Sequence, residues 1–537
     1  MLTPKLLQAR FHTQHPILVE AILTLTRKIH ATPPSSSLHP PACYLVGGFV
    51  RDLLLDLSPT DADVEVYGLE ASTVEKILND LFPNQVNLVG RGFGVFKISL
   101  DHGYELDVAI PRRESKAGVG HKDFVVMGDP TLDPKAATRR RDFTINAILL
   151  DPLTGELIDP WHGQLDLHHH VLRVVDPDRF DEDPLRVYRA VQFAARFSLS
   201  VEPTTFELLR RLVADGKLTH LPAERITAEW RKLLLKSDKP SIGLELMRTL
   251  GIIERDYPEL HALVGLKQDP EWHPEGDVWT HTLMSLDAAA HILKPPTFLT
   301  EPLNPLQGTF EIPHSSSLQP PACHFSIPEQ LQIMLGTLCH DLGKASTTVL
   351  APKNGVMRIR SPGHEAAGII LTQTFCARLC FGEEAVRGAL IGAGEHLKPN
   401  SLNRAAFQDH WSELQYVNAV RKLLKRIYPM PWRALLAIAE ADHRGRTFPD
   451  AQAPGYPDGE RLAAVILTHH LDETPTKPLL SGTDLLTLGL TPGPEFGKLI
   501  RNIEAARDAG EILTKEAALE RAKLALLDHN ATGKPRT

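Results

Sequence analysis

Two aspartates one residue apart, Asp61 and Asp63, stand at the start of the β-rich stretch "TDADVEV". Because alternate residues of a strand face the same side, both carboxylates can point at one ligand. Asp107, in "YELDVAI", lies on another expected strand and is a candidate third carboxylate. Oxygen ligands arranged in this way suit Mg²⁺, and two such ions can hold the attacking and departing oxygens of a phosphoryl displacement. A DxD pair taken alone is equally typical of a polar turn.

Glycines and arginines accompany these carboxylates. In "YLVGGFVRD", Gly47 and Gly48 would let the backbone approach a triphosphate, and Arg51 would contact it from the helix that follows. Three more arginines, residues 139–141, precede an apolar strand in "RRRDFTINAILLD". A solvated run of charges is the ordinary explanation for such a cluster.

A second polar group lies in "DEDPLRVYRAVQFAARF". Asp183, Arg186 and Arg189 are spaced i, i+3 and i+6, which predicts that they line one side of a helix. A carboxylate beside a guanidinium offers the acceptor and donor groups that the Watson–Crick edge of a base would recognise. A salt bridge within the helix explains the same spacing, and the spacing leaves both interpretations open.

Histidines and aspartates follow later in the chain. The candidate metal ligands are His281, His340, Asp341, His364, His396 and Asp442. Neutral imidazole and carboxylate together suit a divalent transition metal such as Ni²⁺ or Mn²⁺. The chain has 25 histidines, so any single one is more simply explained as a surface residue or a hydrogen-bonded core residue.

The elements that must position these residues follow from the apolar pattern. Short β-rich pieces alternate with helical ones to about residue 165, which predicts an α+β head with a mixed sheet. Helical spacing predominates afterwards, and a further helix is predicted over residues 17–30. We therefore expect five segments: an N-terminal helix with a Pro/Ser linker (1–42), the head (43–170), a helical neck and body (171–265), a helical metal-binding domain with a Pro-rich insert at 294–330 (266–450), and a helical tail module (451–537).

The bulk composition limits the class of protein. A chain of 537 residues is too long for one core, and its 42% hydrophobic and 23% charged content is typical of soluble proteins. The sequence has no long apolar run and no secretory signal, and its five cysteines form no CxxC pair. These features predict a cytoplasmic protein without a membrane partner. The net charge of −8 gives no general attraction to nucleic acid, so RNA contacts have to come from local basic patches, and no DNA partner is expected.

Five motifs occur in a set order: "LVGGFVRD", "TDADVEV", "RRRDFTINAI", "EDPLRVYRAVQFAARF" and "ERITAEW". Together they resemble the class II CCA-adding tRNA nucleotidyltransferases and the related bacterial poly(A) polymerases, members of the polymerase-beta-like superfamily. The resemblance implies that Asp61 and Asp63 bind Mg²⁺ and that the tRNA 3′ end, CTP and ATP are the partners. It further implies nucleotide contacts from Gly48, Arg51, Arg141, Arg186 and Arg189, and an "EDxxR" motif of Glu182, Asp183 and Arg186 that selects C and then A. The assignment of Asp107 comes from the strand pattern alone.

The order His, then His-Asp, then His, His and Asp, opening with "WHPEGDVWTHTL", resembles the HD phosphohydrolase domain appended to some CCA-adding enzymes. This resemblance implies metal-dependent phosphatase and 2′,3′-cyclic phosphodiesterase activity. The expected function is therefore addition or repair of the tRNA CCA end, with a second hydrolytic site. Two alternatives stay open: a poly(A) polymerase or A-only adding enzyme on the same fold, and an HD phosphohydrolase whose head only binds RNA.

Overall fold

The structure is a computed structural model that describes residues 2–34, 40–59, 61–88, 94–116, 124–293, 325–353, 355–453, 455–472, 479–488, 493–508, 511–512 and 514–531. Most of the expected Pro-rich insert, residues 294–324, lies outside the described residues. The chain forms two compact units, Met1–Asp256 and Tyr257–Thr537. The finer division into five segments stays a prediction.

The first unit is built on a mixed seven-stranded sheet in the order β3-β4-β5-β2-β1-β8-β9. Strand β2 pairs antiparallel with β1 on one side and parallel with β5 on the other. The sequence-based expectation of an α+β head is confirmed. The strands are β1 (Ala42–Val46), β2 (Asp61–Tyr67), β3 (Val86–Leu88), β4 (Val95–Ser99), β5 (Glu105–Ala109), β8 (Leu149–Leu150) and β9 (Leu157–Ile158), and separate two-stranded pairs join β6 (Arg112–Lys116) to β7 (Phe124–Gly128) and β10 (Val171–Leu172) to β11 (Ser200–Val201).

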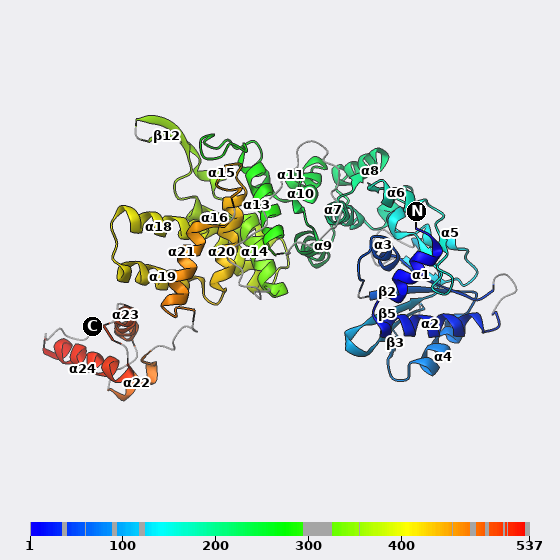
Figure 1. The fold of residues 1–537 in the computed structure, drawn as a ribbon, viewed down its shortest axis with the longest axis horizontal. Helices are drawn as coiled ribbons and strands as arrows, with labels where there is room; N and C mark the ends of the chain where they lie inside the picture. Colours follow the sequence, from blue (N-terminus) through cyan, green and yellow to red (C-terminus); the bar gives the residue numbers. More distant parts are fainter. Residues whose placement is uncertain are drawn as a thin grey trace. The chain divides into compact units, whose positions relative to one another are not determined.

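The two sides of strand β2 differ in polarity, as alternation along a half-buried strand requires. Ala62, Val64 and Val66 are buried in the main core of the unit. Helices α2 (Pro16–His30) and α4 (Ala71–Leu81) contribute their apolar residues to the same core and lie together along the sheet (Figure 1). The predicted helix over residues 17–30 is thus confirmed, although it packs on the sheet and was expected in a separate segment, whereas helix α1 (Pro4–His12) was not predicted.

A helical layer follows the sheet in the first unit. Helix α7 (Arg186–Arg196) packs against α9 (Ala223–Lys236) and α10 (Pro240–Thr249), and Trp230 of α9 is fully buried. The predicted helices of this region are confirmed. The other helices of the unit are α3 (Gly48–Leu54), α5 (Pro134–Thr138), α6 (Gly163–His168), α8 (Pro203–Ala214) and α11 (Ile252–Asp256), with 3₁₀ turns η1 (Asp101–Gly103), η2 (Thr144–Asn146) and η3 (Phe180–Glu182).

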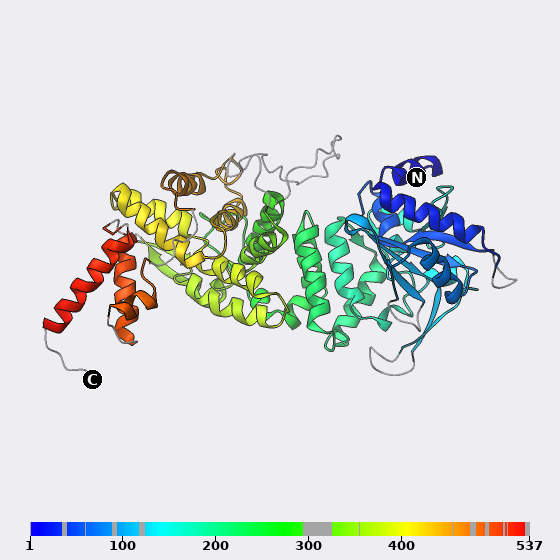
Figure 2. The ribbon, with the colours of Figure 1, turned by 90° about the horizontal axis from the view of Figure 1, so that it is seen from below.

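The second unit is almost entirely helical (Figure 2). Helix α14 (Ile327–Cys339) lies at its centre and contacts α13 (Val278–Leu293), α17 (Glu383–Glu395) and α20 (Trp432–Arg444). The approach of α14 to α17 depends on small residues, because a Cβ on Gly392 would lie 2.4 Å from the Cα of Gly336.

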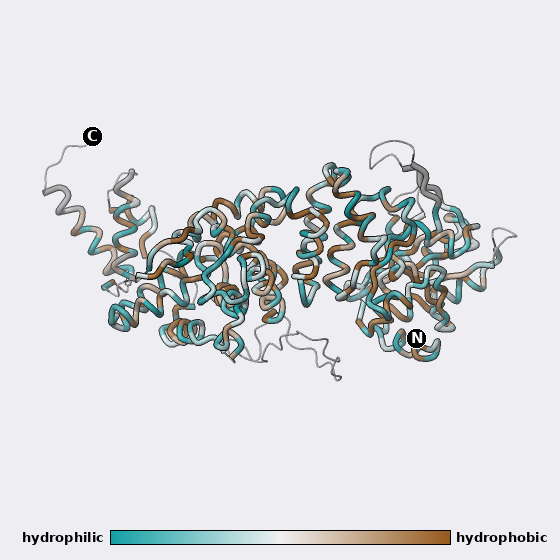
Figure 3. Tube along the Cα trace, turned by 90° about the horizontal axis from the view of Figure 1, so that it is seen from above, coloured by the Kyte–Doolittle hydropathy of each residue, from teal (hydrophilic) through white to brown (hydrophobic). Residues whose placement is uncertain are grey.

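The remaining elements complete the second unit, and its C-terminal helices share a hydrophobic core of their own. Apolar and polar residues alternate along the helices, as amphipathic packing requires (Figure 3). None of the described helices is long and apolar enough to cross a bilayer. These elements are α12 (Pro258–His261), α15 (Lys344–Thr347), the hairpin of β12 (Val349–Lys353) and β13 (Val356–Arg360), α16 (His364–Ala377), α18 (Lys398–Gln408), α19 (Glu413–Ile427), α21 (Pro457–Thr468), α22 (Gly482–Thr487), α23 (Pro494–Asp508) and α24 (Lys515–Ala531).

Candidate active sites

Three carboxylates meet where β2 and β5 pair. In the parallel register, Asp63 lies opposite Asp107, and Asp61 begins the same strand two residues earlier. Alternate residues of a strand face the same side of a sheet, and residues directly opposite each other in paired strands do so too. The side chains of these three residues therefore share one side of the sheet, which we call the carboxylate face. The Oδ1 atom of Asp107 is buried without a hydrogen-bond partner. The expected grouping is confirmed, and the role of each carboxylate as a ligand stays a prediction.

The crowding of these carboxylates disfavours their charged forms. Asp63 is exposed as a residue, but the protein around its carboxylate partly desolvates it. This desolvation raises the pKa of Asp63, with further contributions from Asp107, Glu65 and Asp61. Burial, followed by nearby carboxylates, raises the pKa of Asp107 in the same way. A hard divalent cation would relieve this repulsion and satisfy the unpartnered oxygen. The donor set therefore fits Mg²⁺.

Glu65 is an additional carboxylate that our sequence reasoning missed. It is 1% exposed and accepts hydrogen bonds from Arg140 (2.9 Å), Arg141 (3.1 Å) and the Tyr67 hydroxyl (2.9 Å). Burial alone would raise the pKa of Glu65, but the two guanidiniums outweigh it and the pKa is lowered. Glu65 thus anchors arginines beside the carboxylate face. Glu65 follows Asp63 by two residues, as Asp63 follows Asp61, so the alternation of side chains along the strand could have identified it.

The turn between β1 and α3 requires glycine. Gly47 has a φ of +70°, a conformation that L residues rarely adopt. A Cβ at Gly47 would lie 3.0 Å from Asp63 Oδ2 and 3.0 Å from Arg141 Nη1. Gly48 is the first residue of α3. The turn therefore makes room for a carboxylate and a guanidinium at the same point.

Arg51 differs from the exposed phosphate contact that the sequence suggested. It is 3% exposed, and its guanidinium donates to Asp52 Oδ1 (2.6 and 2.8 Å) and to Asn146 Oδ1 (2.6 Å). The same group lies 4.4 Å from the centre of the Phe197 ring. Burial, the largest cause, lowers the pKa of Arg51. In this structure Arg51 supports the packing behind the site, and a direct nucleotide contact stays a prediction.

The expectation that Asp183 lies on the same helix as Arg186 and Arg189 is wrong. Helix α7 begins at Arg186, and Asp183 has an extended backbone with φ −128° and ψ 94°. The reason is Pro184, since a residue before proline is disfavoured in the helical region. Asp183 instead accepts a hydrogen bond from Arg225 of α9 at 2.8 Å. Arg225 belongs to the "ERITAEW" motif and was also missed as a site residue.

Arg186 and Arg189 are fixed by partners other than Asp183. Arg186 donates to the carbonyl oxygens of Arg140 (2.7 Å) and Arg179 (3.0 Å). Arg189 forms an ion pair with the buried carboxylate of Asp142 at 2.6 Å. Because neither arginine pairs with Asp183, the alternative of a salt bridge within the helix does not apply.

The EDxxR residues and the carboxylate face are connected. Arg140 offers its carbonyl oxygen to Arg186 and its guanidinium to Glu65, so one residue joins the start of α7 to strand β2. Glu182 is half-buried and ends η3 directly before this start. The expected nucleotide-selecting residues thus border the expected metal ligands.

The six candidate ligands of the second unit gather at one place, which we call the HD centre. His281 lies on α13 and Asp442 on α20, while the other four residues lie where helices begin or end: His340 and Asp341 after α14, His364 at the start of α16, and His396 after α17. All six are buried except Asp442, which is half-buried. The sequence-based expectation that these residues converge is confirmed.

The six ligands of the HD centre fall into two adjoining sets of three, with Asp341 within reach of both. In the first set, His281 Nε2 lies 3.0 Å from Asp442 Oδ1 and 3.3 Å from His340 Nε2. Asp341 lies between this set and the next, because its Oδ2 atom is 3.3 Å from His340 Nε2.

In the second set, Asp341 Oδ1 lies 3.6 Å from His364 Nε2 and 4.0 Å from His396 Nε2. Burial lowers the pKa of His396 to about 4, so its imidazole is in the neutral form that binds metals. Although burial opposes it, Lys344 at 2.7 Å holds the pKa of Asp341 well below its usual range. Neutral imidazoles and ionised carboxylates are donors that fit divalent transition metals.

A cavity of about 500 Å³ lies over the HD centre. Four of the ligands line it: Asp341, His364, His396 and Asp442. The lining also includes the cationic residues Lys344, Arg358 and Arg446, and the half-exposed Trp272. The lining also contains carboxylates such as Asp269 and Asp450, so its charge is mixed, and the cations beside the ligand sets could contact a substrate that carries phosphate.

Known proteins resemble the chain in both sequence and fold. Residues 43–173 match the family described as poly A polymerase head domain, and residues 198–264 match the one described as the probable RNA and SrmB-binding site of polymerase A. A protein of Xylella fastidiosa (strain M12) named multifunctional CCA protein is 34% identical over 422 residues, which cover 78% of this chain and 87% of the relative. The relative from strain 9a5c has the same identity and coverage.

Solved structures of two enzymes share the fold. The CCA-adding enzyme of Bacillus stearothermophilus in complex with CTP aligns with a TM-score of 0.56 and 18% identity, over 98% of this chain and 100% of that one. The Thermotoga maritima CCA-adding enzyme complexed with tRNA_CCA aligns with a TM-score of 0.51 and 18% identity, over 98% and 99%. On the strength of the relatives, this chain belongs to the family of the multifunctional CCA proteins, which are CCA-adding tRNA nucleotidyltransferases.

Proposed function

We propose that the protein adds or repairs the 3′-terminal CCA of tRNA with CTP and ATP. The observation that carries this proposal is the carboxylate face, on which Asp61, Asp63 and Asp107 meet beside Arg141. The tRNA 3′-hydroxyl attacks the α-phosphate of the nucleotide, and pyrophosphate leaves. Family membership supports the choice of tRNA as substrate.

The residues around this face have separate tasks in the proposal. Asp61 and Asp63 would hold Mg²⁺, which when bound neutralises negative charge and lowers the pKa of the attacking hydroxyl. Arg141 is fixed by Glu65 at 3.1 Å and therefore presents its charge beside Asp63, where a triphosphate would lie. The tRNA would be held through its shape and backbone.

Nucleotide selection is assigned to Glu182, Asp183 and Arg186. Because Asp183 is held by Arg225 at 2.8 Å and Arg186 by two backbone carbonyls, neither side chain is free to rotate without breaking a contact. Groups held in one arrangement can discriminate between the hydrogen-bonding edges of C and A.

We further propose that the HD centre is a metal-dependent phosphohydrolase. Its two adjacent ligand sets, and the lysines and arginines in the lining of its cavity, favour hydrolysis of phosphate esters, including 2′,3′-cyclic phosphates at RNA ends. The metal would be a divalent transition ion such as Ni²⁺ or Mn²⁺. A cytoplasmic location would accord with a tRNA substrate.

The decisive experiment supplies the full chain with a tRNA transcript lacking CCA and with labelled CTP, labelled ATP, or both. We expect two C residues from CTP alone and one further A when both nucleotides are present. A second transcript ending in CC should accept A from ATP alone. Repeated A addition would favour a poly(A) polymerase, and addition only to the CC-ending transcript would favour an A-only enzyme.

A variant pair tests the assigned residues. Asp63→Ala should reduce incorporation by at least about a thousandfold, since a metal ligand supplies several kcal/mol of transition-state stabilisation. Asp80→Ala, which changes an exposed residue of α4, is the matched control and should keep full activity. Full activity of Asp63→Ala would end the metal assignment. Hydrolysis at the HD centre without any incorporation would favour a head that only binds RNA.

A further inference from the structure

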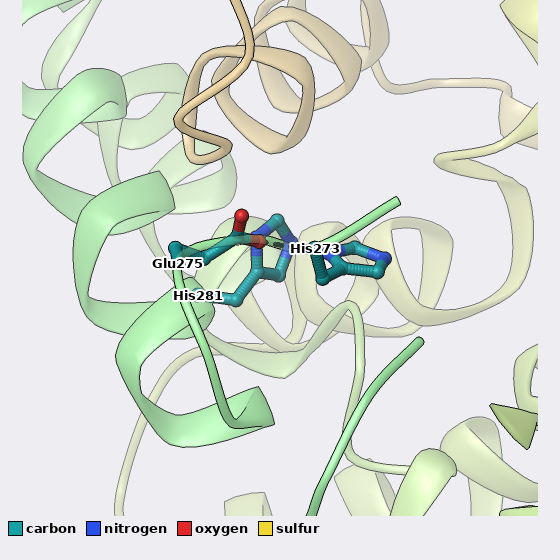
Figure 4. A group of neighbouring side chains, drawn as sticks. All are labelled: His273, Glu275 and His281. Atoms are coloured by element: carbon teal, nitrogen blue, oxygen red, sulfur yellow. Dashed lines mark hydrogen bonds and ion pairs between the residues drawn. The ribbon is translucent and has the colours of Figure 1, made fainter. Parts of the chain in front are cut away.

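One ligand histidine of the HD centre is oriented differently from the other three. The Nδ1 atoms of three imidazoles lie within hydrogen-bond distance of backbone carbonyl oxygens: His340 with Thr337 (2.6 Å), His364 with Ser361 (2.9 Å) and His396 with Gly392 (2.9 Å). In His281, the Nδ1 atom instead lies 3.0 Å from the Glu275 carboxylate (Figure 4). Among these four histidines, His281 is therefore the one whose Nδ1 lies nearest to a carboxylate and not to a backbone carbonyl.

Glu275 is held firmly in this position. Its side chain is fully buried, and the same Oε1 atom lies 2.8 Å from Nδ1 of His273. The loop that carries it is fixed by Asp277, whose carboxylate accepts backbone hydrogen bonds from Thr280 (2.8 Å) and Gly265 (2.6 Å). A buried carboxylate that is hydrogen-bonded to His273, on an anchored loop, cannot easily turn away from His281.

The contact determines what His281 offers to a metal. A carboxylate at Nδ1 keeps the proton on that nitrogen and leaves the lone pair on Nε2. That Nε2 faces the first ligand set, 3.0 Å from Asp442 and 3.3 Å from His340. An anionic acceptor also makes the imidazole a stronger donor than a neutral carbonyl does, because it pushes more electron density toward Nε2.

We propose that Glu275 is a positioning residue for His281, and that this pair makes the set of His281, His340 and Asp442 the tighter of two metal sites. The inference rests on the proposed function of the HD centre, in which His281 is a metal ligand. It assigns a role to the glutamate of "WHPEGDVWTH" that the family comparisons do not specify.

The test is a Co²⁺ titration of the full chain followed by visible absorption. Asp63→Ala is included throughout, so that the head does not contribute metal binding. We expect two binding events, and Glu275→Gln should weaken the tighter one by about 10- to 100-fold, the usual effect of losing a residue that orients a ligand. The weaker event should change by less than about twofold. If only one ion binds, the same loss is expected for that event.

Two further variants separate this role from general destabilisation. Glu365→Gln is the matched control, because Glu365 lies 3.5 Å from His364 Nδ1 while the Ser361 carbonyl lies closer at 2.9 Å. It should alter neither event by more than about twofold. In a His281→Ala background, adding Glu275→Gln should have no further effect, since its action passes through the missing imidazole.

The outcomes distinguish the inference from the function on which it rests. Absence of any Co²⁺ spectrum from the protein with an unmodified HD centre would overturn the proposed metal centre itself. If the unmodified HD centre binds Co²⁺ and Glu275→Gln binds it with the same affinities, the inference is overturned and the metal centre stands. The inference would also be overturned if Glu275→Gln weakened both Co²⁺-binding events equally. The same holds if Glu275→Gln weakened Co²⁺ binding as strongly in the His281→Ala background as in its absence.

Discussion

Buried carboxylates hold the arginines of the head in place. Glu65 accepts hydrogen bonds from Arg140 and Arg141, and Asp142 pairs with Arg189. Each carboxylate lies inside the protein while its arginine is at least partly accessible. This arrangement orders positive side chains near the carboxylate face before any substrate binds, which lowers the entropy that binding has to overcome.

The pair of Asp142 and Arg189 makes the stability of the first unit depend on pH. Burial opposes ionisation of Asp142, but Arg189, Asn146 and the Phe143 backbone outweigh it and hold the pKa below its ordinary value. The folded-state pKa is thus below the unfolded value of about 3.9. The pair therefore stabilises the fold fully above about pH 4, and the contribution is lost as the pH falls through the folded-state pKa.

Asp142→Asn should accordingly lower the free energy of unfolding at pH 7 by about 3 kcal/mol, because Arg189 loses the charge of its buried partner. The difference from the unmodified protein should shrink below about pH 4. Urea unfolding at pH 7 and at about pH 3.5 checks both expectations. Asp178→Asn, at an exposed position, serves as a control with little change at either pH, and a difference that is constant with pH would count against the pair.

Some site residues follow from the sequence and others do not. Asp61, Asp63 and Asp107 were predictable because strand alternation is a local rule. The pairing of Asp183 with Arg225 spans 42 residues and depends on the packing of α9 beside the start of α7, which no local pattern contains. Pro184, however, was visible and could have excluded Asp183 from the helix.

At the scale of elements, the turn between β1 and α3 is tightly constrained by the site residues around it. Gly47→Ala would force a left-handed backbone at a cost of about 1–3 kcal/mol and would place a Cβ against Asp63 and Arg141. We expect incorporation of CTP and of ATP to fall by about 10- to 100-fold, since 1.36 kcal/mol corresponds to a factor of ten. Steady-state kinetics with both nucleotides measures this.

Gly103→Ala is the matched control for this turn. Gly103 has a φ of +78°, but a Cβ there would meet nothing within 4 Å. The two variants share the backbone strain and differ in the contact with site residues. Similar loss of activity in both would show that strain, and not displacement of Asp63 and Arg141, causes the effect.

Most helices and strands could be predicted from the sequence. The places where they bring site residues together could not. Strands β2, β4 and β5 and helices α7, α8 and α9 follow from periodicity. The division of the HD ligands into two sets depends on how five helices, α13, α14, α16, α17 and α20, approach one another. Close approach relies on glycines such as Gly336 and Gly392, whose role becomes visible only in three dimensions.

At the scale of the whole molecule, the two candidate sites lie in separate compact units. His340→Ala or Asp341→Ala should therefore abolish metal-dependent hydrolysis of a phosphodiester such as bis-p-nitrophenyl phosphate and leave CCA addition within about twofold. Parallel assays of hydrolysis with Ni²⁺ or Mn²⁺ and of nucleotide incorporation make the comparison. Loss of both activities in a folded variant would contradict the independence of the sites.

The extent of the head also becomes clear only at this scale. Apolar residues of helix α2, including Leu18, Ile22 and Leu25, belong to the same core as the sheet, although the matched poly A polymerase head begins at residue 43. The head of this protein therefore includes residues that neither the family boundary nor our expectation of a separate N-terminal segment assigned to it.

The parallel pairing of β2 with β5 has a consequence for biosynthesis. Asp63 leaves the ribosome well before Asp107, and the two carboxylates meet only when β5 has been made and docked beside β2. Pairing of segments that are distant in sequence is slow, because the intervening loop has to close first. A nascent chain that ends before Glu105 would thus carry both aspartates of the DxD pair and still lack the complete carboxylate face, so nucleotide-adding activity should not begin before β5 has been made and docked beside β2.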